Sequence, residues 1–94
     1  MKIELFHWDS YRKEIPILDK NRNPIDVELK ATFCIYKDGK LEWLQELEKE
    51  NWKLKLEFSQ DDIKMFEAGE RKGEIKVKIW DRTRREEFDI VIYQ

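Results

Sequence analysis

Two stretches of the chain alternate between apolar and charged residues. The first covers residues 52–58 and the second covers residues 74–80. Alternation with a period of two is typical of a β-strand that has one buried face and one face in water. Between these stretches, Ser59 and Asp62 form a capping pair, which predicts a short helical turn near residues 60–66. The sequence therefore predicts a strand, a helical turn and a second strand.

The same alternation predicts further strands on both sides of this unit. They cover residues 2–8, 11–18, 31–36 and 87–93. Turn-forming residues separate them at 9–10, 19–24, 38–39 and 81–84, and residues 25–27 are expected to be extended. Short strands at regular spacing with turns between them are typical of a β-sandwich.

Residues 41–50 carry two conflicting signals. Their helix propensity is high, and their three leucines would share one side of a helix. A strand would instead turn Leu41, Trp43 and Leu47 toward the core. Because a hairpin signal at 38–39 precedes the segment and a turn at 50–51 follows it, the context favours a strand over the helix.

The predicted fold is all-β. We expect a small antiparallel β-sandwich of six or seven strands, with one short helical turn near 60–66, as a single domain over residues 1–94. The chain is 40% hydrophobic and 13% aromatic, which is enough for a packed core. Trp52 and Trp80 are expected to fill part of that core.

The overall charge is nearly balanced. Nineteen lysines and arginines (Lys+Arg 19) oppose Asp+Glu 21, for a net charge of -2. This balance gives no general attraction to nucleic acid or to an anionic membrane. The N-terminal residues lack the apolar run of a signal peptide, and no stretch has the apolar length of a membrane span. We therefore expect synthesis in the cytoplasm and neither a membrane nor a nucleic-acid partner.

No group of residues has the spacing of a catalytic, metal or cofactor site. His7 is the only histidine and is expected to be a packed or surface residue, and Cys34 lies in mid-strand, where a thiol acts as a small hydrophobe. The acids at 61–62 are explained by the helix cap. The alternating acid and amides of 19–23 resemble a calcium loop, but no glutamate closes it, and a turn explains them. We predict a non-enzyme with no cofactor, metal or small-molecule substrate.

The surface charges are unevenly distributed. Residues 70–85 contain seven basic and three acidic side chains, whereas the four glutamates of 42–50 face one lysine. A solvated strand face explains each run, but opposed patches could also guide head-to-tail packing. Two tryptophans of uncertain burial could add to a contact surface. The candidate protein-contact residues are Trp8, Trp43, Arg71, Lys76, Lys78, Arg82, Arg84 and Arg85.

A series of short motifs runs along nearly the whole chain. They are Asp9-Ser10-Tyr11, Pro24-Ile25-Asp26, Ala31-Thr32-Phe33-Cys34-Ile35, Ser59-Gln60-Asp61-Asp62 ahead of Gly69, and a closing hairpin from Gly73 to Tyr93. Their order resembles the small immunoglobulin-like domains of tailed-phage virion proteins, such as the N-terminal module of baseplate upper proteins. The chain departs from that pattern at His7-Trp8, Arg22 and Arg82.

This resemblance implies a structural or protein-interaction module of a phage or prophage particle. The expected place is a baseplate, tail or head accessory, reached after synthesis in the host cytoplasm. The expected partners are other virion proteins or further copies of the chain. A small phage-encoded regulator or inhibitor that binds a host protein is the alternative, because the size and solubility of the chain also fit it.

Overall fold

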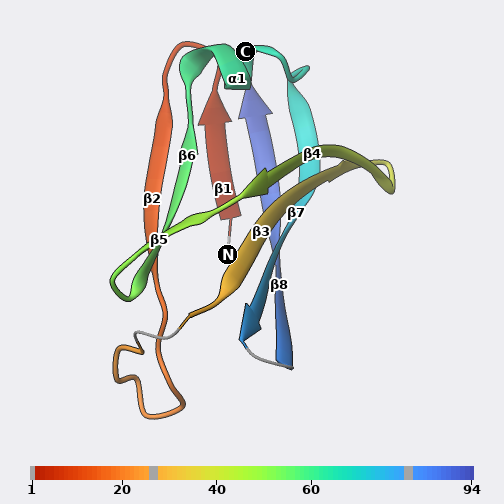
Figure 1. The fold of residues 1–94 in the computed structure, drawn as a ribbon. Coiled ribbons are helices and arrows are strands. Elements are labelled where there is room, and N and C mark those ends of the chain that lie inside the picture. The colour runs from red at the N-terminus through yellow and green to blue at the C-terminus, as the bar shows by residue number, and fades with distance from the viewer. Residues whose placement is uncertain (1, 26–27, 80–81) are drawn as a thin grey trace.

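The computed structural model describes residues 2–25, 28–79 and 82–94, which form two β-sheets and one short helix (Figure 1). The elements are β1 (Lys2–Phe6), β2 (Tyr11–Pro16), β3 (Lys30–Lys37), β4 (Lys40–Glu46), β5 (Glu48–Glu50), β6 (Lys53–Phe58), α1 (Gln60–Lys64), β7 (Gly69–Ile79) and β8 (Arg82–Tyr93). The predicted all-β sandwich is confirmed, although the described residues form eight strands. None of these residues belongs to a helix that is long and apolar enough to cross a membrane.

The larger sheet has the strand order β1-β8-β7-β3-β4, and the smaller has the order β2-β6-β5. All neighbouring strands are antiparallel except β1 and β8, which run parallel, so the expectation of a wholly antiparallel sandwich is wrong at this pair. These strands lie at opposite ends of the chain. No tight turn joins them, and therefore nothing local fixes their relative direction.

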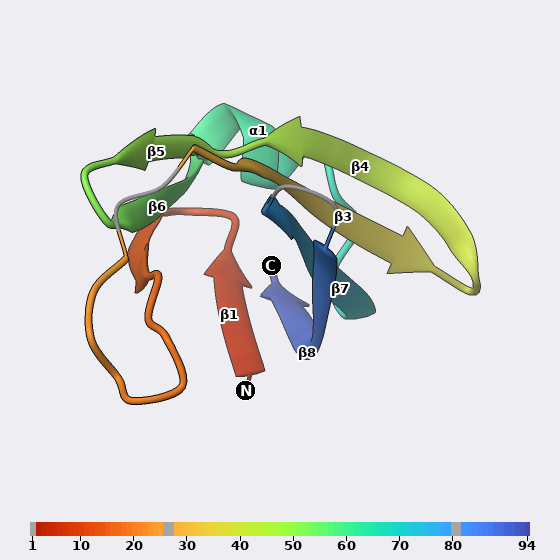
Figure 2. The ribbon, with the colours of Figure 1, turned by 60° about the horizontal axis from the view of Figure 1, so that its bottom comes forward.

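The segment 41–50 is extended, as the sequence context predicted, but it belongs to two sheets. Its first part forms β4 in the larger sheet, and its last part forms β5 in the smaller sheet. The segment therefore links the two sheets (Figure 2). Leu47 lies between them, is buried, and donates its backbone N–H to Ala31 at 2.9 Å. Leu41 is 53% exposed, so its predicted inward position is wrong. A β-bulge opposite Ile35 and Tyr36 inserts one residue into β4 and changes the alternation.

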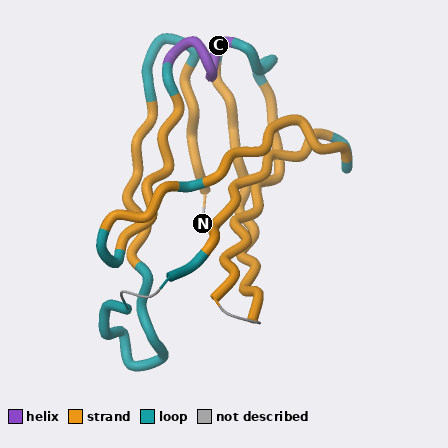
Figure 3. Tube along the Cα trace, in the orientation of Figure 1, coloured by secondary structure: helices purple, strands orange, loops and turns teal. Residues whose placement is uncertain are grey.

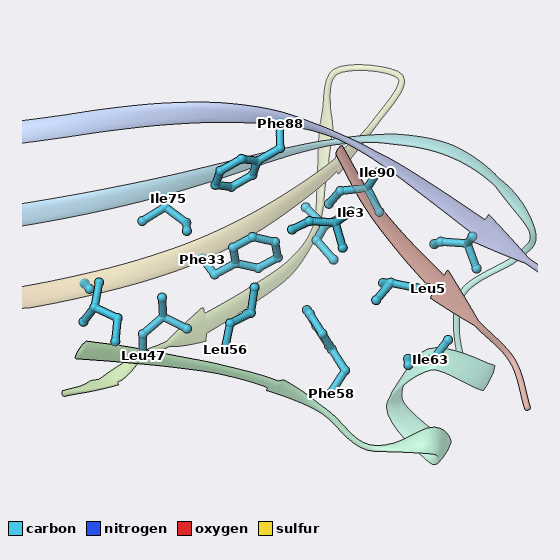
Figure 4. Close-up of a cluster of buried hydrophobic side chains, with 14 of the residues drawn as sticks. Ile3, Leu5, Phe33, Leu47, Leu56, Phe58, Ile63, Ile75, Phe88 and Ile90 are labelled. Carbon is cyan, nitrogen blue, oxygen red and sulfur yellow. The ribbon is translucent and has the colours of Figure 1, made fainter. Parts of the chain in front are cut away.

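The core lies between the two sheets (Figure 4). The ring of Phe33 is central, with its centroid 5.7 Å from that of Phe58 and 6.0 Å from that of Phe88. Ile63 of α1 is fully buried and closes one end of the sandwich. The predicted cap of this helix is confirmed, because the Ser59 hydroxyl accepts from the Asp62 N–H and the Asp62 carboxylate accepts from the Ser59 N–H, both at 3.1 Å.

Of the two tryptophans expected in the core, the structure places Trp52 outside it. Trp52 is half-buried and lies outside the core cluster, because it occupies the turn after β5 and β6 begins at Lys53. Trp80 lies outside the described residues, as do residues 26–27, which were expected to be extended. The predicted 38–39 hairpin turn is confirmed by φ angles of 51° at Asp38 and 80° at Gly39.

The last strand begins earlier than the sequence indicated. Residues 82–84 were expected to form a turn, but Arg82 pairs with Ile79 and β8 continues from there to Tyr93. Residues 82–87 are all polar or charged, so they show no apolar–polar alternation that would predict a strand. Pairing with β7 outweighs their weak local preference for a turn. As a result, β7 and β8 form a long ribbon that runs well past the N-terminal end of β1 (Figure 1), whereas β3 continues beside β7 as far as Lys78.

Candidate interaction surface

The β7–β8 ribbon divides the predicted basic surface between two faces. Lys76 lies opposite Arg85, and Lys78 lies opposite Lys30 of β3. Residues directly opposite each other share a face of the sheet, so these four form a basic outer face. Lys76 is half-buried and lies 3.4 Å from Glu74, and the other three are exposed. Sequence reasoning missed Lys30, because only the strand register brings it beside Lys78.

Arg82 and Arg84 lie on the opposite, core-facing side of the ribbon. Arg84 is paired with Val77 and Arg82 with Ile79, and both of these apolar residues are half-buried. The two arginines are exposed. They therefore belong to a different surface from the basic outer face.

Arg71 is buried, with 5% of its surface exposed, so its expected place on a contact surface is wrong. Its Nε donates to the Glu42 carboxylate at 3.1 Å, and its two terminal nitrogens donate to the backbone oxygens of Glu67 and Glu70 at 2.9 and 3.0 Å. Glu42 is the extra residue of the β4 bulge. Because Arg71 and Glu42 neutralise each other, Arg71 does not contribute to the predicted basic surface and Glu42 does not contribute to the predicted acidic run.

The two tryptophans proposed for the contact surface have different environments. Trp8 is 60% exposed, with its ring centroid 4.9 Å from that of Phe6. Trp43 is half-buried and packs against the core, with its ring centroid 5.8 Å from Phe58 and 5.5 Å from Phe66. Trp8 thus lies on the surface, whereas Trp43 contributes mainly to packing.

The candidate chemical groups have structural partners. The Nε2 of His7 lies 2.7 Å from the backbone oxygen of Phe66, so this nitrogen carries a hydrogen and donates it. Cys34 is buried. The carboxylate of Asp19 accepts two backbone N–H bonds within its own turn, at 2.8 and 2.9 Å. Across the described ranges, no group of three His, Cys, Asp or Glu residues could hold a metal ion.

Several surface charges are paired within the sheets. A hydrogen bond from Lys72 holds the pKa of Asp89 below its ordinary value, and one from Lys37 lowers the pKa of Glu67. These exposed pairs contribute little to stability because solvent screens them. In the part of the chain that the structure describes, Arg82, Arg84 and Arg85 form no ion pair. Their charges remain available to a partner.

Comparison with known proteins gives a similarity of fold. No family model and no curated protein matches the chain. A solved structure of the N-terminal domain of phage TP901-1 ORF48 superposes with a TM-score of 0.58 and 16% sequence identity. The match covers 100% of this chain and 86% of that one. The resemblance to a phage β-sandwich domain is therefore confirmed at the level of the fold.

Proposed function

We propose that the chain is a non-enzymatic structural module of a phage or prophage particle and acts through protein contacts. The observation that carries this proposal is the fold shared with a phage protein domain over the full length of the chain. The proposed place is a baseplate, tail or head accessory, reached after synthesis in the host cytoplasm. The proposed partners are other virion proteins or further copies of the chain.

The distribution of charge supports this role. The basic outer face consists of Lys30, Lys76, Lys78 and Arg85, and it lies on β3, β7 and β8. The exposed glutamates Glu48 and Glu50 of β5 lie opposite Lys55 and Lys53 of β6, so the acidic run is balanced within its own sheet. The basic outer face is the unbalanced surface, and such a charge directs association and suppresses wrong partners.

A nonsense mutation in the gene tests the proposal through the stage at which infection stops. In a host that cannot suppress the mutation, we expect normal phage DNA replication and normal amounts of other particle proteins. The particles themselves should be incomplete or non-infectious. A block before particle proteins accumulate would contradict the proposal and indicate a regulator or inhibitor that acts on the host.

Complementation with variant proteins links the defect to the surface. A wild-type copy should restore infectious particles, whereas a Lys78→Glu/Arg85→Glu copy, altered on the basic outer face, should restore at most a small fraction. Lys64→Glu reverses an exposed charge on α1 and is the matched control, which should restore them fully. Equal rescue by both variants would show that the basic outer face is not a contact.

A further inference from the structure

Part of one edge of the larger sheet has no neighbouring strand. β8 pairs with β7 along its whole length, but it pairs with β1 only from Asp89 to Tyr93. No described strand lies along this second edge between Arg82 and Glu87. Figure 1 shows the lower half of β8 running past the N-terminal end of β1. An open strand edge presents backbone donors and acceptors that another strand can use.

The hydrogen bonds between β1 and β8 show which backbone groups of β8 point toward the open edge. The His7 N–H donates to the Tyr93 oxygen at 2.9 Å, so the backbone of Tyr93 and of alternate residues before it faces the β1 side. The register between β7 and β8 is unbroken, and the alternation therefore continues along the strand. It directs the backbone N–H and C=O groups of Thr83, Arg85 and Glu87 toward the open edge.

An apolar groove lies beside this edge on the core-facing side. One hollow of about 420 Å³ is lined by residues that include Ile15, Ile17, Leu54, Val77 and Arg84. A second, of about 590 Å³, shares Val77, Ile79 and Arg84 and adds residues that include Ile25 and Arg82. Figure 3 shows the loop after β2 below the sheets, across from the projecting ends of β7 and β8. The core face of the ribbon is thus incompletely covered here.

The charges around the groove are mainly positive. Arg82, Arg84 and Arg85 are exposed, and the described residues provide none of them with an ion pair. Two acids also line the groove: Asp19, whose carboxylate is bound to the backbone of its own turn, and the exposed Glu86. Of these arginines, Arg85 lies on the outer face of the sheet, where its exposed charge favours the carboxylates of an incoming chain.

We propose that this edge binds an extended segment of a partner protein in which aliphatic residues alternate with acidic ones. The segment pairs with β8 in line with β1, and its aliphatic side chains enter the groove on the core-facing side. Alternation then places its carboxylates on the outer face, beside Arg85. Strand addition of this kind takes affinity from backbone hydrogen bonds and specificity from alternate side chains. The inference rests on the proposed function, because it names the partner that such a module would hold.

Peptide binding monitored by NMR tests this proposal. The probe is a short synthetic peptide of alternating valine and glutamate, added to the isotopically labelled chain. With the peptide bound, we expect hydrogen exchange at the amides of Thr83, Arg85 and Glu87 to slow by about tenfold or more. The amides of Arg82 and Arg84 already face β7, and their exchange should change much less.

Matched controls separate the contribution of the backbone hydrogen bonds from that of the charges. A peptide with N-methyl groups at alternate amides, which cannot donate to β8, should bind about tenfold or more weakly, and a valine–lysine peptide should not bind. An Arg85→Glu variant should lose about tenfold or more in affinity for the valine–glutamate peptide. Lys64→Glu should retain the affinity, and thermal melting should show that both variants are folded.

Three results would overturn the proposal. One is no binding with the peptide in large excess, and another is binding that leaves exchange at the open edge unchanged. The third is protection of that edge without peptide that rises with protein concentration, because a second copy would then occupy it. None of these results affects the detection of the chain in particles. Conversely, absence from particles would contradict the proposed function and leave peptide binding intact.

Discussion

Arg71 is a buried charge that is held by three separate acceptors. They are the carboxylate of Glu42 and the backbone oxygens of Glu67 and Glu70. The side chain of Arg71 is 2% exposed and that of Glu42 is 26% exposed. A buried ion pair adds little net stability over an apolar pair, but removal of one member leaves the other desolvated and unpaired.

Arg71→Met should therefore lower the free energy of unfolding by about 3 kcal/mol, since the methionine fills space but leaves Glu42 and two backbone oxygens without their donor. Lys78→Met, on the same strand but exposed, should change it by less than about 0.5 kcal/mol. Denaturant unfolding of both variants measures the difference. Similar values for the two would show that the Arg71 contacts contribute nothing.

The sequence could not distinguish Arg71 from its basic neighbours. It lies in a Glu-Arg-Lys run, and β7 begins at Gly69, before the clear alternation that starts at Glu74. The sequence therefore did not indicate on which face of the sheet Arg71 would lie. His7 and Cys34 were easier to interpret. The sequence offers neither of them the partner residues that catalysis needs, and this favoured a structural role for both.

At the scale of elements, Gly73 sets how closely the side chains of β8 pack against β7. A Cβ at this position would lie 2.6 Å from Cδ1 of Ile90 and 3.3 Å from Cδ2 of Phe88. Both of these residues are buried and cannot move freely. The centre of the β7–β8 ribbon thus depends on the absence of one methyl group.

Gly73→Ala should lower the free energy of unfolding by about 1–3 kcal/mol through overpacking. Ile90→Val removes the Cδ1 atom that the new methyl group would meet, and alone it should cost about 1 kcal/mol. The double variant should be more stable than the sum of the two changes predicts. Strict additivity in denaturant unfolding would contradict this close approach.

Local signals predicted most elements but not how they pair. The turn residues at 38–39 and 50–51 were sufficient to favour a strand over a helix in 41–50. No local signal marked Leu47 as the point where the chain passes from one sheet to the other. The parallel pairing of β1 with β8 was also beyond local signals, since it joins residues from opposite ends of the sequence.

At the scale of the whole molecule, the two ends of the sandwich differ. One end is closed by α1 through the buried side chain of Ile63. At the other end the β7–β8 ribbon lies beside a groove in which Ile15, Val77 and Ile79 are half-buried. The sequence predicted the charge bias of this region. It could not predict the open edge, which exists because β1 is much shorter than the strand it pairs with.

Quantitative mass spectrometry of purified particles tests the central claim most directly. If the chain is a structural component, it should be present at a constant ratio to the major capsid protein across gradient fractions and after a high-salt wash. Absence from washed particles, together with stoichiometric recovery on a single host protein from infected cells, would contradict the account.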